Sequence, residues 1–186
     1  MRYHSLMLVV LGGLLGSGRR VLARKLAEQQ HFHLYDMDAK YPHRHVFDET
    51  GRAKEVTVRL HTDEARLSLY KRVLEDMPKL SKMHPNIVLE DPFTRAKPRD
   101  AFFNAARKHF DRVVFVWIDS DEPNVTKRLE LMRRKGLIQS IQTALERRKM
   151  VAAGLERLDP STRVFKCMLA DDVETKALWT LINSEI

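Results

Sequence analysis

Five short, uninterrupted apolar runs constrain the fold of this chain more than any other feature of its sequence. They are Leu6–Leu11, Phe32–Tyr35, Ile87–Leu89, Val113–Ile118 and Val164–Met168. Runs of this length that are apolar throughout, rather than at every second position, are typical of strands buried on both faces. We therefore predict a mainly parallel sheet of five strands whose two faces are both covered.

Segments with the periodicity of an amphipathic helix lie between and after these runs. We expect helices at Arg19–Gln30, at Asp63–Met77, from Pro98 or Arg99 to His109, from Pro123 onward, at Leu137–Leu158 and at Val173–Ile182. Pro78 should end or kink the second of them, because proline lacks the N–H of a helical bond. Strands that alternate with helices indicate one α/β domain over residues 1–186, with helices on both faces of the sheet.

The composition narrows the class of protein. The 186 residues include 33 Lys and Arg against 25 Asp and Glu, a net charge of +8, and 44% are hydrophobic, as in a globular domain. Cys167 is the only cysteine, so an internal disulfide and a cysteine-based zinc cage are both excluded. The apolar stretch from Leu6 to Leu15 is too short to span a membrane as a helix. We expect a cytoplasmic protein without a membrane partner.

Glycines gather between the first expected strand and the first expected helix, at Gly13, Gly16 and Gly18. Glycine lets successive backbone N–H groups turn toward one point, and the helix that follows directs the positive end of its dipole to the same place. A strand, a glycine-rich turn and a helix in this order therefore indicate a phosphate-binding loop. The alternative is a glycine-rich turn that binds no ligand.

The segment Gly13-Leu-Leu-Gly16-Ser17-Gly18-Arg19-Arg20 closely resembles the Walker A loop of the P-loop kinases. The resemblance implies a three-layer P-loop NTPase fold, in which the phosphates of ATP are held by Gly13, Gly16, Ser17, Gly18, Arg19 and Arg20. Two positions depart from the usual motif. Arg19 replaces the lysine that follows the transferred phosphoryl group, and Arg20 replaces the residue whose hydroxyl holds Mg²⁺.

The order of elements along the rest of the chain is similar to that of nucleotide, shikimate and polynucleotide kinases. The resemblance implies that Asp36, after the second expected strand, orients Mg²⁺ or accepts the proton of the attacking hydroxyl. It also implies that Asp38 contacts the substrate. Aspartate is a common turn and helix-cap residue, so a purely structural role for Asp36 stays open.

A second acidic segment ends the third expected strand. Asp91 and Thr94, followed by Arg99, resemble the strand-Asp-x-Thr segment of kinases of the polynucleotide kinase type, with one residue more between Asp and Thr. The resemblance implies that Asp91 is a metal ligand and that all three residues bind the substrate, at the sheet edge where open α/β folds bind ligands. A loop carboxylate without a ligand is the alternative for Asp91.

Basic residues crowd the stretch from Pro123 to Arg157, which has nine Lys and Arg against three Glu. By resemblance to the same kinases, a lid over residues 128–148 carries Arg128, Arg133 and Arg134, which stabilise the charge of the transferring phosphoryl group. For each of these arginines the alternative is a solvated helix face. Residues 40–60 are polar and irregular, so we expect a mobile substrate loop there.

These features predict an ATP-binding phosphotransferase with Mg²⁺ as cofactor. Its reaction would move a γ-phosphoryl group to a hydroxyl or phosphate acceptor on a small molecule, a nucleotide or a polynucleotide. The replacements at Arg19 and Arg20 favour an alternative, a nucleotide- or phosphate-binding regulatory module without kinase activity. A third alternative is a nucleic-acid-binding protein, because the basic helices could neutralise backbone phosphates, but no recognisable motif accompanies them.

Overall fold

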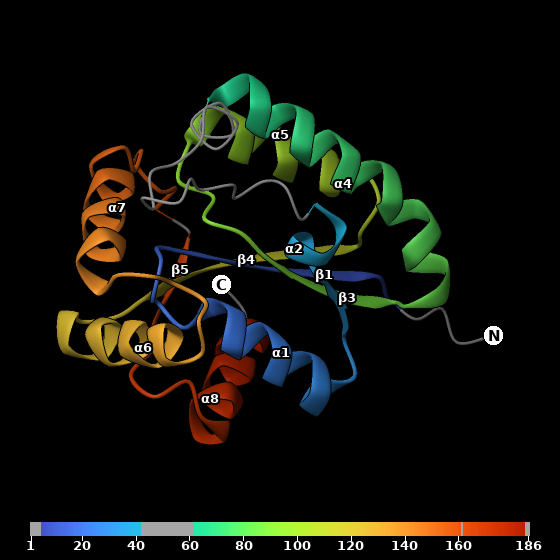
Figure 1. Ribbon diagram of the computed structural model, residues 1–186. Helices are drawn as coiled ribbons and strands as arrows, with labels where there is room; N and C mark the ends of the chain where they lie inside the picture. The colour runs from blue at the N-terminus through green and yellow to red at the C-terminus, as the bar shows by residue number, and fades with distance from the viewer. Residues whose placement is uncertain (1–4, 42–61, 161, 185–186) are drawn as a thin grey trace.

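The computed structural model describes residues 5–41, 62–160 and 162–184, without the side chain of Asp38. Five strands form one sheet in the order β2-β3-β1-β4-β5, and every neighbouring pair is parallel. Helices cover both faces, with α4 and α5 on one side of the sheet and α1 and α8 on the other (Figure 1). The prediction of a five-stranded α/β fold with helices on both faces is confirmed.

The elements alternate along the chain much as the apolar runs and helical periodicity predict. The strands are β1 (Met7–Gly13), β2 (His33–Tyr35), β3 (Asn86–Glu90), β4 (Arg112–Asp119) and β5 (Arg163–Lys166). The described helices are α1 (Arg19–Gln30), α2 (Met37–Lys40), α4 (Asp63–Met83), α5 (Ala96–Ala106), α6 (Glu122–Arg134), α7 (Ile141–Ala153) and α8 (Asp172–Asn183).

Alternation of side chains along the central strand β1 divides the core into two halves. Met7, Val9 and Leu11 pack with buried residues of α1 and α8. Leu8 and Val10 point to the opposite face, among the aromatic residues of α4 and α5. Burial of each such side chain stabilises the fold by about 1.5–3 kcal/mol. The loop that follows β1 therefore starts from a strand that is held firmly on both faces.

A third, smaller apolar cluster joins α6 to α7. Its buried members are Val125, Leu129 and Ala144, and Leu15 of the loop between β1 and α1 packs against them. Side chains in contact of this kind fix the position of the helix pair, so α6 and α7 lie directly beside the glycine-rich loop.

Three predicted helix bounds need correction. α4 does not end at Pro78 but continues to Met83, since proline removes one donor while buried Met77 keeps this turn packed against the core. α5 begins earlier, at Ala96, because Pro98 is tolerated in a first turn. α7 is shorter than predicted, because the Ser140 hydroxyl caps it by accepting the N–H of Thr143.

Most of the predicted loop over residues 40–60 lies outside the described residues, as does the side chain of Asp38. Among the helices in the described ranges, none is both long enough and apolar enough to cross a membrane.

Candidate functional site

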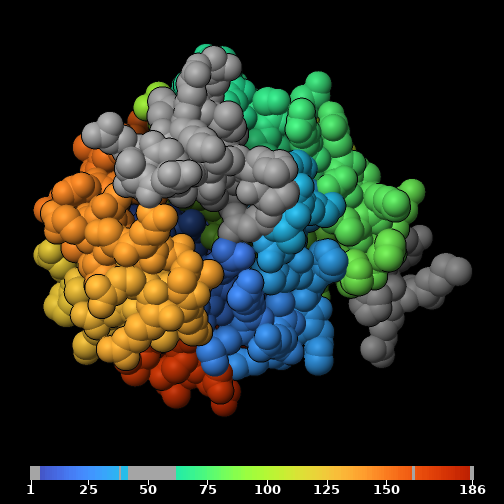
Figure 2. All heavy atoms as spheres, viewed as in Figure 1, coloured from blue at the N-terminus to red at the C-terminus, as the bar shows by residue number. Residues whose placement is uncertain are grey.

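The carboxyl ends of β1, β3 and β4 lie together at the topological switch point of the sheet, where the strand order reverses. β1 lies between β3 and β4, so the connections on its two sides run away from each other. In open parallel sheets a crevice forms at this position, and ligands bind there. Figure 2 shows a depression between α1 and the α6–α7 pair, with dark blue atoms of the β1 region on its floor.

The loop from Gly13 to Gly18 joins β1 to α1 and depends on glycine at both of its ends. Gly13 (φ 144°) and Gly18 (φ 94°) have backbone angles that other residues rarely adopt. A Cβ at Gly13 would lie 2.6 Å from the carbonyl oxygen of Ile118, and one at Gly18 would lie 2.7 Å from Cys167 Sγ. Only glycine fits either position, so the close packing of this loop imposes the glycine pattern.

Two features of this loop favour an anion. The N-cap residue of α1 is Gly18, which has no side chain to accept a hydrogen bond from the first turn of the helix. Ser17 Oγ is buried and has no hydrogen-bond partner within the described residues. Buried polar groups are nearly always paired. An oxyanion in the loop would satisfy the helix N–H groups and the serine hydroxyl together.

Arg19, at the position of the usual lysine, is held inside the loop. Its Nε donates to Glu90 Oε2 at 2.6 Å, and its Nη1 donates to the carbonyl oxygens of Gly13 and Leu14 at 2.8 and 3.0 Å. The side chains of Arg19 and Glu90 are only 16% and 10% exposed, so water screens this ion pair less than a surface pair. Arg19 thus bridges the loop to the last residue of β3.

Arg20 and Asp36 form a weaker and more exposed arrangement. Nη2 of Arg20 lies 3.8 Å from Asp36 Oδ1, and Nη2 of Arg24 lies 3.9 Å from Asp36 Oδ2. Asp36 Oδ1 also accepts the N–H of Ala39 at 3.1 Å, so it caps the short helix α2. The structural alternative for Asp36 therefore describes its observed contacts, whereas its catalytic and metal-binding roles stay predictions.

Arg128, predicted as a lid arginine, ties three loops together, and its catalytic role stays a prediction. Its Nη1 donates to the carbonyl oxygen of Gly16 and to Ser120 Oγ, both at 2.8 Å. Its Nη2 donates to the carbonyl oxygens of Cys167 and Met168 at 3.1 and 2.6 Å. The reason is topological, because α6 begins directly after β4, and its second turn therefore faces the loop that follows neighbouring β1. Arg128 supports the loop from within the fold.

Arg148 of α7 also reaches the loop. Its Nη1 donates to the carbonyl oxygen of Leu15 at 2.7 Å. Burial is the main cause that lowers the pKa of Arg148; the carboxylate of Asp119 opposes this shift, whereas the charges of Arg128 and Arg19 add to it. In the sequence Arg148 is one of several basic residues of the expected helix Leu137–Leu158. Neither helical periodicity nor a motif distinguishes it from the others.

The two other predicted lid arginines, Arg133 and Arg134, are exposed at the end of α6. No contact among the described residues ties either of them to the loop, so their catalytic role stays a prediction.

Asp91 is fully buried beneath the same sheet edge. Its Oδ2 accepts hydrogen bonds from Arg66 Nη1 and from the Tyr70 hydroxyl, both at 2.7 Å. Both donors belong to α4, which packs on α5 beside the end of β3. Asp91 therefore joins a helix to a strand end, which is a structural arrangement for the carboxylate that was predicted as a metal and substrate ligand.

The two residues predicted with Asp91 as substrate ligands also make structural contacts. The carbonyl oxygen of Thr94 accepts the N–H of Glu156 at 2.9 Å. Arg99 is buried and donates to the carbonyl oxygens of Phe93 and Arg157 at 3.1 and 2.7 Å. These bonds attach the segment after α7 to the segment after β3. Substrate binding by Thr94 and Arg99 stays a prediction.

Several solved structures share this arrangement. A sugar kinase from Janibacter sp. HTCC2649 matches with a TM-score of 0.62 at 17% identity, over 96% of each chain. A gluconokinase from Sinorhizobium meliloti 1021 matches with a TM-score of 0.61 at 18% identity, over 98% of this chain and 95% of that one. The APS kinase of Mycobacterium tuberculosis, solved with AMPPNP and APS, matches with a TM-score of 0.60 at 14% identity, over 97% and 99%.

This chain has the P-loop kinase fold. No family model matches the sequence, and no curated protein matches it either. The likeness is therefore one of fold, and the residues of the loop must be judged on their own contacts.

The P-loop kinase fold is present here with a glycine-rich loop between β1 and α1, but this loop lacks the usual hydroxyl for Mg²⁺. Arg20 stands where a hydroxyl would hold the ion, and a guanidinium cannot coordinate a cation. Among the described residues, no three His, Cys, Asp or Glu side chains gather where they could hold a metal. Oδ2 of Asp91 already accepts two hydrogen bonds. Within the described residues the usual loop hydroxyl for Mg²⁺ is thus missing, and metal binding by Asp36 and Asp91 stays a prediction.

Proposed function

We propose that this chain binds the polyphosphate of a nucleotide, ATP or a similar triphosphate, in the loop from Gly13 to Arg20. The observation that supports this most is the buried, unpartnered Oγ of Ser17 beside the uncapped N-terminus of α1. The kinases of similar fold support the nucleotide part of the proposal, since one of them was solved with AMPPNP. The backbone geometry at the loop glycines would by itself fit an anion smaller than a nucleotide polyphosphate equally well.

The charges around the loop also favour a polyphosphate. Arg128 and Arg148 both donate to neutral carbonyl oxygens of the loop, at Gly16 and Leu15. Within the described residues, no carboxylate oxygen lies within 4.0 Å of either guanidinium. A bound polyphosphate would compensate these charges through charge-assisted hydrogen bonds. Because Arg20 replaces the hydroxyl that would hold Mg²⁺ in the loop, we expect this binding to need no metal.

Calorimetric titration with AMPPNP, once with Mg²⁺ and once with a chelator, tests the proposal. We expect binding of similar strength in both conditions. Arg148→Ala should weaken it about tenfold, because one charge-assisted contact is lost. Lys149→Ala, which removes the same charge from the exposed neighbouring position, should change it less than about twofold. No binding in either condition would refute the proposal, and binding only with Mg²⁺ would refute its metal independence.

Phosphoryl transfer to a small molecule or a nucleotide is the second candidate. It is favoured by the position of Glu90, a carboxylate at the end of β3 in direct contact with the loop through Arg19. Restoring the motif with Arg19→Lys and Arg20→Ser separates the two candidates. A gain of ATP hydrolysis in the double variant indicates a binding module derived from a kinase. Activity in the natural chain that the double variant loses would show that the arginines take part in transfer.

A further inference from the structure

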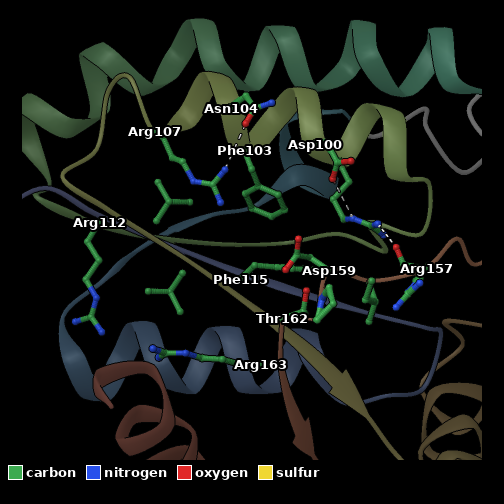
Figure 3. Close-up of a pocket in the computed structure, with 15 residues that line it drawn as sticks. Asp100, Phe103, Asn104, Arg107, Arg112, Phe115, Arg157, Asp159, Thr162 and Arg163 are labelled. Atoms are coloured by element: carbon green, nitrogen blue, oxygen red, sulfur yellow. Dashed lines mark hydrogen bonds and ion pairs between the residues drawn. The ribbon is translucent and has the colours of Figure 1, made fainter. Parts of the chain in front are cut away.

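A cavity of about 740 Å³ lies between α5, the first half of β4 and the segment that follows α7. Figure 3 shows residues from all three parts around it, with Phe103 on α5, Phe115 on β4 and Arg157 on the segment after α7. This segment therefore packs incompletely against the sheet. The polar contacts at its start, close to the end of α7, then matter for where α7 lies.

Glu156, in this segment, supplies the cap that α5 lacks. The N-cap residue of α5 is Arg95, whose side chain makes no capping hydrogen bond. Instead, Glu156 Oε2 accepts the N–H of Ala96 at 2.5 Å, and the N–H of Glu156 donates to the carbonyl oxygen of Thr94 at 2.9 Å. A carboxylate at a helix N-terminus is favoured as an acceptor and by the helix dipole. Glu156 therefore attaches the end of α7 to the start of α5.

The next residue strengthens this attachment. The carbonyl oxygen of Arg157 accepts a hydrogen bond at 2.7 Å from Nη2 of buried Arg99 on α5. In Figure 3 a dashed line marks this bond at Arg157. Two successive residues after α7 are thus bound to the first two turns of α5.

Arg95 extends the attachment to α4. Its Nε donates to Asp63 Oδ1 at 2.9 Å, and its Nη2 lies 3.5 Å from Glu156 Oε1. Asp63 is the first residue of α4. The hydrogen bond with Asp63 is the main cause that raises the pKa of Arg95, and the charge of Glu156 adds to it. One guanidinium therefore joins the start of α4 to the carboxylate that holds the end of α7.

α7 reaches the glycine-rich loop through Arg148. Arg148 lies in the second half of this helix and donates to the carbonyl oxygen of Leu15 at 2.7 Å. Hydrogen bonds along a helix make it stiff over one or two turns. The position of the end of α7 therefore sets where the guanidinium of Arg148 lies relative to the loop.

We propose that Glu156 and Arg95 are positioning residues for the nucleotide site, which fix the end of α7 and so keep Arg148 at the glycine-rich loop. The inference rests on the proposed function, in which Arg148 contributes to polyphosphate binding. Glu156 and Arg95 act through Arg148 and not by contact with the nucleotide. Their side chains are 39% and 40% exposed, so water screens their ion pair in part, and we expect effects of a few-fold.

A double-mutant cycle on the affinity for AMPPNP, measured by calorimetry, tests the proposal. We expect Glu156→Ala to weaken binding about threefold to fivefold, because Arg148 is then less well placed. Removing a carboxylate by itself favours an anion, so this loss is opposite in sign to the effect of net charge. In the Arg148→Ala background, Glu156→Ala should change the affinity less than about 1.5-fold. Losses that add in full would overturn the proposal.

Matched controls separate positioning from charge. Glu146→Ala removes the same charge from an exposed position on α7, where Glu146 accepts a hydrogen bond from Gln142 of the same helix, and it should not weaken binding. Arg95→Ala should lower the affinity about as much as Glu156→Ala, whereas Lys97→Ala, at an exposed position of α5, should lower it less than about 1.5-fold. Equal losses in each variant and its control would overturn the proposal.

Hydrogen exchange without nucleotide distinguishes failure of this inference from failure of the proposed function. Glu156→Ala should raise the exchange rates of amides in the last turn of α7 and leave those of α8 unchanged. If Glu156→Ala does not fold, Glu156→Gln, which keeps an acceptor for Ala96 and loses the charge, takes its place. Unchanged exchange in α7, or raised exchange with undiminished AMPPNP affinity, would overturn the inference. No AMPPNP binding by the natural chain would refute the proposed function, and the exchange rates would still decide whether Glu156 fixes α7.

Discussion

Arg19 and Glu90 form an ion pair that joins the glycine-rich loop to the end of β3, with Nε of the arginine 2.6 Å from Oε2 of the glutamate. The cation that would meet a bound phosphate is thus already neutralised by the last residue of β3. A nucleotide that binds here must compete with Glu90 for Arg19. We expect this competition to favour highly charged anions, since a weakly charged anion gains too little to replace the carboxylate.

Removing the charge of Glu90 should therefore strengthen nucleotide binding. We expect Glu90→Gln to raise the affinity for AMPPNP about threefold to tenfold, because Arg19 no longer has a carboxylate to leave. Calorimetry measures the change. Glu75→Gln makes the same change in net charge on the exposed side of α4 and serves as the control. Weaker binding in Glu90→Gln would show that Glu90 orients Arg19 for the ligand rather than competing with it.

Arg128 should matter for stability more than any other arginine of the predicted lid. Arg128→Ala leaves the carbonyl oxygens of Gly16, Cys167 and Met168 without their common donor, so we expect the free energy of unfolding to fall by about 2–5 kcal/mol. Arg133→Ala, at an exposed position, should change it by less than about 0.5 kcal/mol. Urea denaturation measures both. A small loss in Arg128→Ala, joined with weaker AMPPNP binding, would support the lid role instead.

Asp91 should behave as a structural carboxylate. Asp91→Ala leaves Arg66 buried without this partner, which is expected to cost about 3–5 kcal/mol of unfolding free energy. Adding Arg66→Met to Asp91→Ala should restore part of the loss, because the buried charge is then removed. Chemical denaturation of Asp91→Ala, of Arg66→Met and of the double variant completes this double-mutant cycle. An unchanged stability in Asp91→Ala, with Mg²⁺-dependent nucleotide binding abolished, would establish the metal role.

His33 should make the fold less stable in mild acid. Its ring stacks on that of His84 with centroids 4.3 Å apart, and burial is the main cause that lowers its pKa below the ordinary 6.5, followed by the charges of His84 and Lys40. Below pH 6.5 the unfolded chain therefore binds more protons at this residue than the folded one. Its contribution to stability is complete above that pH and falls as the pH drops toward the lowered pKa.

The melting temperature between pH 7.5 and pH 5 measures this effect. We expect it to fall less steeply in His33→Gln than in the natural chain, whereas His109→Gln, at an exposed position, should leave the slope unchanged. A slope that is the same in all three proteins would place the acid sensitivity elsewhere.

The sequence by itself determined the fold class and the position of the glycine-rich loop, because both are set largely by local patterns. Continuous apolar runs belong to strands buried on both faces, and β1 shows the reason, with successive side chains shared between two separate core clusters. The glycines of the loop follow from backbone angles and close contacts at Gly13 and Gly18. The backbone angles act within a few residues and so show in the sequence, whereas the close contacts of Gly13 with Ile118 and of Gly18 with Cys167 are tertiary.

Only the tertiary structure decided which charged groups meet. Arg19 and Glu90 are 71 positions apart, and Arg148 and the Leu15 carbonyl are 133 positions apart. Their contacts depend on β3 lying next to β1 and on α7 packing beside the loop. Arg128 and Asp91, assigned to a ligand from the sequence, contact other parts of the chain, and their roles toward a ligand stay predictions. The sequence gives the charge of each side chain, but the order of the strands and the packing of the helices determine which group it contacts.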